Sequence, residues 1–139
     1  MSDCLHTVSR VLISIVFIVF GYLQFTNIGA YIANPAVVKA AAMAHGILSP
    51  TVIAYLVAAI DLIGGILILV GFQTRWTALV LIVFVILTLL LAHNFWTMEG
   101  PSRIGNQVNF YKNLVIIGAL LQLYIHGAGR YSVDGRMRK

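Results

Sequence analysis

The chain has 139 residues, of which 60% are hydrophobic and only 9% are charged, and its mean hydropathy is +0.96. A water-soluble domain of this size needs far more polar surface, so the composition indicates an integral membrane protein in contact with the lipid bilayer. The net charge is +5, but no basic stripe with interleaved aromatic residues occurs, which argues against a nucleic acid partner.

The first predicted span covers about residues 8–26 and carries its polar residues on one side. Four residues interrupt the apolar run at steps of four, seven and three, which places them on one stripe of an α-helix. They are Arg10, Ser14, Gly21 and Gln24. We expect this stripe to face the interior of a helical bundle and the remaining aliphatic and aromatic residues to face lipid.

The connection over residues 27–50 is predicted to contain a short helix. Asn34-Pro35 is a helix-start signal, and the Ala-rich run after it ends near Gly46. Such a helix is too short to span a membrane, so we expect it to lie along the interface or over the mouth of the bundle. Pro50 then opens the second span at its first turn, where a missing N–H costs least.

The second predicted span, about residues 51–72, carries one ionisable group, Asp61, near its centre. A bare carboxylate at that depth costs at least about 2.5 kcal/mol, so Asp61 must be protonated, paired or turned toward a polar cavity. Ala54, Ala58 and Gly65 recur with Asp61 at helical spacing, so we expect another helix to approach this face closely.

Two further spans follow, over about residues 76–95 and 109–126, separated by a polar loop at 97–108 with Gly-Pro and Gly-Asn turn signals. Residues 127–139 form a basic tail. The predicted fold is therefore all-α, a single membrane domain over 1–139 built as a four-helix bundle with a short interfacial helix between its first two spans.

The distribution of Lys and Arg predicts the orientation. An even number of spans places both termini on one side, together with the turn at 73–75, and that side has six basic residues against three on the other. The six are Arg10, Arg75, Arg130, Arg136, Arg138 and Lys139, and the three are Lys39, Arg103 and Lys112. The positive-inside rule then predicts cytoplasmic termini and long connections that face outward.

This topology gathers polar residues at the outer ends of three spans. We predict that they surround an outward-facing pocket with Asp61 as its floor. They are Gln24, Asn27, His93, Asn94, Asn109, Lys112 and Asn113. The competing interpretation is that buried polar residues only bond neighbouring helices.

Asp61 and His93 are the candidate catalytic groups, as an acid and base with different proton affinities that would make ligand binding depend on pH. Lys112, His93 and Arg10 are the candidate partners of the Asp61 carboxylate, and Lys112 is favoured because it approaches from the outer side. The histidines are dispersed and no Cys/His pair has ligand spacing, so no metal site is predicted. No phosphate-binding or nucleotide motif occurs either.

The segment from Asp61 to Arg75 resembles the acid-x-x-Gly-Gly, Leu-rich, Gly-x-x-Thr-Arg signature of the DoxX family. Further residues resemble the family in order and spacing: Arg10, Gly21, His93, Lys112-Asn113-Leu114 and the tail from Gly127 to Asp134. Two positions depart from it, since Asp61 stands where the family usually has Glu and Ala128 where Pro is common. The resemblance implies a four-helix inner-membrane protein, some relatives of which are subunits of membrane oxidoreductases linked to sulfur compounds and quinones.

Two hypotheses of function remain open. In the first, the protein is the membrane subunit of an oxidoreductase system, whose pocket holds a quinone-like headgroup or a small sulfur or thiol species and whose electron carrier belongs to a redox-enzyme partner. In the second, it is a non-enzymatic membrane module, either a passage for small solutes or a scaffold for assembling a complex, including a homo-oligomer.

Overall fold

A computed structural model describes residues 2–45 and 47–137, and that part of the chain contains helices and no strands. Four helices are long and apolar enough to cross a membrane: α1 (Ser2–Thr26), α4 (Pro50–Val70), α5 (Thr74–Ala92) and α6 (Gly100–His126). The short ones are α2 (Ile28–Ile32), α3 (Pro35–Met43), the 3-10 helix η1 (Phe95–Thr97) and α7 (Val133–Met137). The predicted all-α fold with four spanning helices is confirmed.

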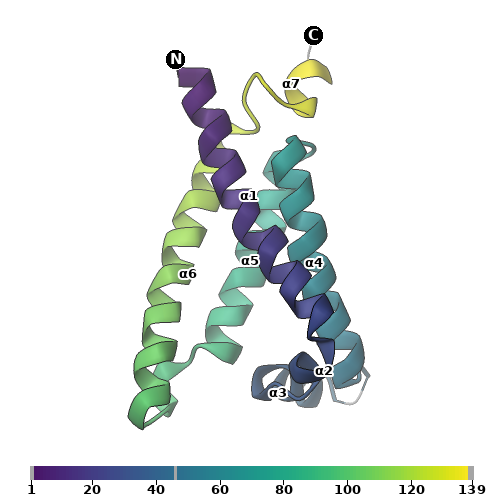
Figure 1. The fold of residues 1–139 in the computed structure, drawn as a ribbon, viewed down its shortest axis with the longest axis vertical. Helices are drawn as coiled ribbons and strands as arrows, with labels where there is room; N and C mark the ends of the chain where they lie inside the picture. Colours follow the sequence, from purple (N-terminus) through teal and green to yellow (C-terminus); the bar gives the residue numbers. More distant parts are fainter. Residues whose placement is uncertain (1, 46, 138–139) are drawn as a thin grey trace.

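The four long helices form two pairs, α1 with α4 and α5 with α6 (Figure 1). Both ends of the chain and the α4–α5 turn lie at one end of the molecule, which we call the termini end. The opposite end, which we call the loop end, carries α2, α3 and η1, and toward it the ribbons of α1 and α6 diverge. Arg138 and Lys139, which contributed to the charge count for the termini end, lie outside the described residues.

The close crossing of α1 and α4 depends on glycine. A Cβ atom at Gly21 of α1 would lie 2.5 Å from the backbone nitrogen of Leu62, and one at Gly65 of α4 would lie 2.8 Å from the backbone nitrogen of Ile18. The two backbones therefore touch where side chains would normally intervene, as in small-residue helix contacts of membrane proteins. The predicted small-residue face of α4 is buried: Ala54, Ala58, Asp61 and Gly65.

The polar stripe predicted on α1 also faces inward. All four of its members are buried: Arg10, Ser14, Gly21 and Gln24. The apolar core that joins the two helix pairs lies nearer the termini end and consists of Phe17, Ile68, Ala78, Leu81, Ile82, Val85, Leu120 and Leu123. Helical periodicity in the sequence thus identifies the interior faces of α1 and α4.

The predicted capped helix in the first connection is α3. The Asn34 side chain accepts a hydrogen bond from the backbone nitrogen of Ala36 at 2.9 Å, which satisfies a free N–H of the first turn. The buried face of α3 packs against Ile53 of α4, so this helix covers the loop end of the bundle. It ends at Met43, and the predicted end near Gly46 lies outside the described residues.

The polar loop predicted over residues 97–108 is mostly helical, because α6 begins at Gly100. Pro101 lies in the first turn, where a helix tolerates proline, and Gly105-Asn106 continues the helix instead of forming a turn. With 27 residues, α6 is about 40 Å long, more than the thickness of a hydrocarbon core of about 30 Å. The polar residues that suggested a loop therefore lie on helical turns that have room outside the hydrocarbon.

Candidate functional site

The midplane acid is hydrogen-bonded by an amide. Nε2 of Gln24 in α1 donates to Oδ2 of Asp61 in α4 at 2.8 Å, and the two side chains are only 6% and 5% exposed. This bond joins α1 and α4 within the apolar part of the bundle. A hydrogen bond to a charged group contributes about 1.5–3 kcal/mol, so the pair helps to fix the packing of the two helices.

Arg10, one of the predicted ion-pair candidates, contacts the tail instead of Asp61. Its guanidinium donates to the backbone oxygens of Ala128 at 3.1 Å and Tyr131 at 2.8 Å. Arg10 precedes Gln24 by fourteen residues, or about 21 Å along α1, which is too far for it to reach the acid.

The other two candidate cations lie on the α5–α6 side of the molecule. Lys112 is exposed on α6, and Nδ1 of His93 lies 3.0 Å from Oδ1 of Asn106. The predicted cationic partner of Asp61 is therefore replaced by Gln24. The physical reason is the pairing of the helices, because α6 packs along α5 and Asp61 faces α1.

Replacing Gln24 by leucine should destabilise the protein, because the Asp61 carboxylate loses its donor inside an apolar interface. We expect a loss of about 1–3 kcal/mol, seen as a lower melting temperature in detergent. Replacing both residues by leucine should recover most of the loss, since two apolar groups leave no unpaired polar atom. Strictly additive effects of Gln24→Leu and Asp61→Leu would show that the hydrogen bond is not the source.

The predicted pocket residues on α6 share the face of that helix that turns inward. Counting back from the buried Leu120, spacings of seven, eight and eleven residues lead to Asn113, Lys112 and Asn109, all on one side of a 3.6-residue helix. Lys112 and Asn109 are nevertheless exposed, and Asn113 is half-buried. The inward face of α6 is therefore apolar and buried toward the termini end, and polar and open toward the loop end.

We call the polar part of this inward face, toward the loop end, the α6 polar face. It consists of Asn106, Asn109, Lys112 and Asn113. It lies on the part of α6 that diverges from α1 (Figure 1). Within it, Nδ2 of Asn113 donates to the backbone oxygen of Asn109 at 3.0 Å. Lys112 is exposed and makes no side-chain hydrogen bond to the described residues, so its ammonium is available to a bound molecule.

His93 lies beside the α6 polar face, at the end of α5. The Asn106 amide donates through Nδ2 to the backbone oxygen of Ser102 at 2.9 Å, so its Oδ1 is the atom turned to His93. Because a carbonyl oxygen accepts, Nδ1 of His93 carries the hydrogen, and Nε2 of the neutral ring is an acceptor. The sequence does not identify Asn106 as a site residue, because Gly105-Asn106 is typical of a turn.

Two predicted pocket residues do not join this group. Asn27, between α1 and α2, is exposed and donates through Nδ2 to the backbone oxygen of Leu23 in α1 at 3.0 Å. Asn94 is half-buried and precedes η1 without a side-chain cap bond. The polar residues predicted as one pocket are thus divided between the α1–α4 interface and the α5–α6 side.

An aromatic cluster adjoins the α6 polar face at the loop end. Phe95 and Phe110 pack edge to face with ring centroids 5.4 Å apart, and Trp96 and Tyr111 pack around them. Trp96 and Tyr111 are both more than half exposed. Exposed Trp and Tyr at the end of a span are typical of the interfacial aromatic belt. In the sequence, the adjacent aromatic residues at 95–96 and at 110–111 are the feature that indicates this cluster.

The tail docks on the termini end of the bundle. Both carboxylate oxygens of Asp134 accept backbone hydrogen bonds at the start of α5, from Gln73 at 2.8 Å and Thr74 at 2.9 Å. The backbone nitrogen of Asp134 donates to the oxygen of Gly71 at 2.9 Å. A carboxylate at a helix N-terminus satisfies free N–H groups and complements the helix dipole, so this contact is structural.

Over residues 2–45 and 47–137, no three His, Cys, Asp or Glu side chains are placed to hold a metal ion.

Comparison with known proteins decides the family. The family model described as DoxX matches residues 5–94. The chain is also 36% identical to inner membrane protein YqjF of Escherichia coli, over 95% of this chain and 91% of that protein. The chain belongs to the DoxX family. This DoxX protein is a multi-pass membrane protein, because it has four helices long and apolar enough to span a membrane and is similar to inner membrane proteins.

Two other relatives show how far the DoxX similarity extends. Inner membrane protein YphA of Escherichia coli is 31% identical over 93% of this chain and 87% of its own length. The ER-derived vesicles protein ERV29 of Saccharomyces cerevisiae is 30% identical over 57% of this chain and 26% of its own length. The family model ends before α6, whereas the two bacterial relatives align with nearly the whole chain. No solved structure matches the chain.

Proposed function

We propose that this DoxX protein is a membrane-embedded binding subunit that takes a small polar or quinone-like molecule at the α6 polar face, from the loop end. The observation that carries the proposal is the exposure of Asn109 and Lys112 on the inward face of a spanning helix. Lys112 precedes the end of α6 by fourteen residues, or about 21 Å, which lies within a hydrocarbon core of about 30 Å. Polar groups at such depth are costly and mark ligand or ion sites.

The chemistry of this face fits a molecule with carbonyl or anionic oxygens. The Lys112 ammonium and the side-chain amides donate hydrogen bonds to such oxygens, as they would to a quinone carbonyl or the oxygens of a small sulfur species. His93, with Nε2 as an acceptor, is the group that exchanges a proton with the ligand. Asp61 takes no part in this scheme, because its carboxylate is bonded within the α1–α4 interface.

The electron carrier of such a system would belong to a partner enzyme. We place the termini end in the cytoplasm, in agreement with the basic residues at that end, so that the ligand enters from the outer side. The protein then acts as the membrane subunit that binds the ligand, and the partner supplies or removes the electrons.

A second candidate function, a scaffold for assembling a membrane complex, is favoured by the opposite face of α6. A Cβ atom at Gly118 would meet nothing within 4 Å, and Gln122 one turn later is exposed. A glycine and a polar side chain on the lipid face of a span suit contact with another transmembrane helix. In this function the partner would be a second copy of the chain or a subunit of the complex.

The test is to titrate the purified protein with a short-chain benzoquinone and to identify by mass spectrometry any small molecule that remains bound. We expect Lys112→Met to weaken quinone binding by roughly tenfold to a hundredfold, because a hydrogen bond from a charged donor is lost. Gln122→Leu, on the other face of the same helix, is the matched control and should bind normally. Equal binding by wild type and Lys112→Met would refute the site, and loss of a copurified subunit in Gln122→Leu would favour the scaffold.

A further inference from the structure

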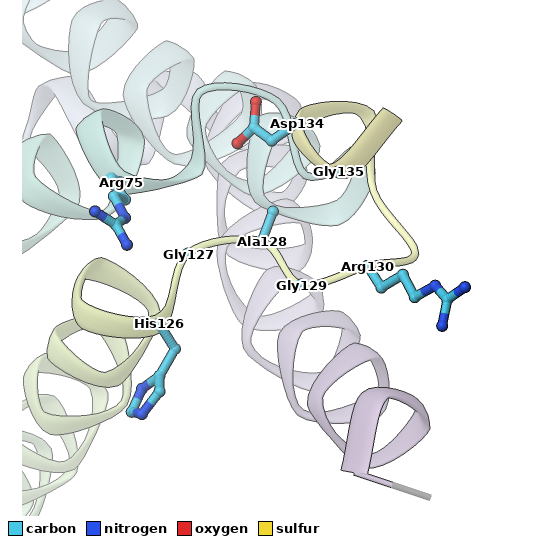
Figure 2. Close-up of a pocket in the computed structure, with 8 residues that line it drawn as sticks. All are labelled: Arg75, His126, Gly127, Ala128, Gly129, Arg130, Asp134 and Gly135. Atoms are coloured by element: carbon cyan, nitrogen blue, oxygen red, sulfur yellow. The ribbon is translucent and has the colours of Figure 1, made fainter. Parts of the chain in front are cut away.

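Two hollows lie under and beside the docked tail at the termini end. The first, of about 210 Å³, is lined by Arg75, His126, Arg130 and the backbone of Gly127–Gly129. The second, of about 640 Å³, is lined by Arg10, Arg130 and Arg136 together with apolar side chains and the segment from Tyr131 to Val133. Figure 2 shows Arg75 and Arg130 on opposite sides of the Gly127–Gly129 loop. Arg130 lines both hollows, so the two adjoin each other and present cationic side chains at the same end of the molecule.

The charges around this region are uneven. Asp134 is the one acid among the described residues that line either hollow, and backbone N–H groups hold both of its carboxylate oxygens. Arg75 uses one nitrogen to donate to the backbone oxygen of Ile125 at 3.1 Å. Arg130 and Arg136 are exposed. The region therefore has spare positive charge for an anion with several acceptor oxygens.

The second hollow also has an apolar wall. Leu69 and Val70, from the last turn of α4, line it together with Val133 of α7, and each of the three side chains is more than one third exposed. An inorganic anion would use the arginines and leave this wall in water. An amphiphile with a phosphate head and an acyl chain would cover both parts of the surface.

We propose that these two hollows bind the phosphodiester headgroup of an anionic phospholipid, with Arg130 and Arg136 on the phosphate and an acyl chain along Leu69 and Val70. Guanidinium groups bind phosphate in a bidentate manner, and the two hollows lie at the ends of helices long enough to span a membrane, where lipid headgroups are expected. The lipid site is separate from the α6 polar face and does not depend on the proposed function.

The experiment is native mass spectrometry of the purified full-length chain in detergent with equal amounts of phosphatidylglycerol and phosphatidylcholine. We expect the wild type to retain phosphatidylglycerol preferentially. Arg130→Gln and Arg136→Gln should each lower the ratio of bound phosphatidylglycerol to phosphatidylcholine by roughly fivefold. Arg103→Gln removes the same charge from the exposed part of α6 at the loop end and serves as the matched control.

The outcomes separate the alternatives. An unchanged lipid ratio in both variants, or an equal loss in Arg103→Gln, would overturn the site, because the preference would then reflect total charge. If glycerol phosphate, at the same concentration as phosphatidylglycerol, displaced the bound lipid, the region would be a site for free phosphate and the lipid proposal would be overturned. Circular dichroism and size-exclusion chromatography identify any variant that fails to fold, and the other single variant then decides the result.

Discussion

Replacing Gly21 by leucine is expected to prevent the protein from accumulating as a folded, monodisperse species. A Cβ atom at this position would lie 2.5 Å from the backbone nitrogen of Leu62 and 2.8 Å from its Cα. Backbone atoms cannot move aside as a flexible side chain can, so α1 and α4 must separate. Overpacking of a core costs about 1–3 kcal/mol for small increments, and an added isobutyl group against backbone should exceed that range.

The measurement is the yield of monodisperse protein in detergent together with its melting temperature. Gly118→Leu is the matched control, because it makes the same substitution in a span where a Cβ atom meets nothing within 4 Å. We expect Gly118→Leu to behave as wild type and Gly21→Ala to be intermediate. A normal yield and melting temperature for Gly21→Leu would contradict the close crossing of α1 and α4.

Replacing Arg10 by methionine is expected to release the tail from the bundle. Arg10 is only 3% exposed, and its two hydrogen bonds reach backbone oxygens more than a hundred residues away in the chain, at Ala128 and Tyr131. Their loss should cost about 3 kcal/mol or more, because each bond has a charged donor. Gly71, which lies against the guanidinium in a left-handed conformation, would lose its neighbour as well.

Limited trypsin digestion in detergent measures this release, since Arg130 and Arg136 lie in the tail. The Arg10→Met variant should be cleaved there faster than wild type and should melt at a lower temperature. Arg103→Met, at an exposed site, should leave both measurements unchanged. Equal cleavage rates for wild type and Arg10→Met would show that Arg10 does not hold the tail.

The interior faces of α1 and α4 were predictable from the sequence, and the pairing of the helices was not. The stripe from Arg10 to Gln24 and the small-residue face around Asp61 both follow from a 3.6-residue period, and both are buried. Which helix covers Asp61 depends on shape, because Gly21 and Gly65 allow α1 to approach α4. For that reason Gln24 could be placed on the right face, yet the acid was assigned a cation from α6.

Contacts between segments far apart in the chain could not be predicted from the sequence either. The sequence contains the Gly-x-x-Thr-Arg segment and the tail, but nothing local indicates that Asp134 caps the helix that starts at Thr74. Similarly, Gly105-Asn106 has the composition of a turn, and only the continuing helix brings Asn106 to His93. Local propensity and tertiary structure disagree there, and the tertiary structure determines the outcome.

Cysteine labelling tests most directly whether the α6 polar face is open to water from the outer side, as the proposed ligand site requires. In a Cys4→Ser background, cysteines at Asn109 and at Val115 compare an inward polar position with a 72% exposed position turned the other way. A membrane-impermeant maleimide added to intact cells should label the cysteine at 109 and should not label the cysteine at 115. A short-chain quinone with all ring positions substituted, which does not alkylate thiols, should slow the labelling at 109. Equal labelling at the two positions, or labelling of 109 only after the cells are opened, would contradict the account.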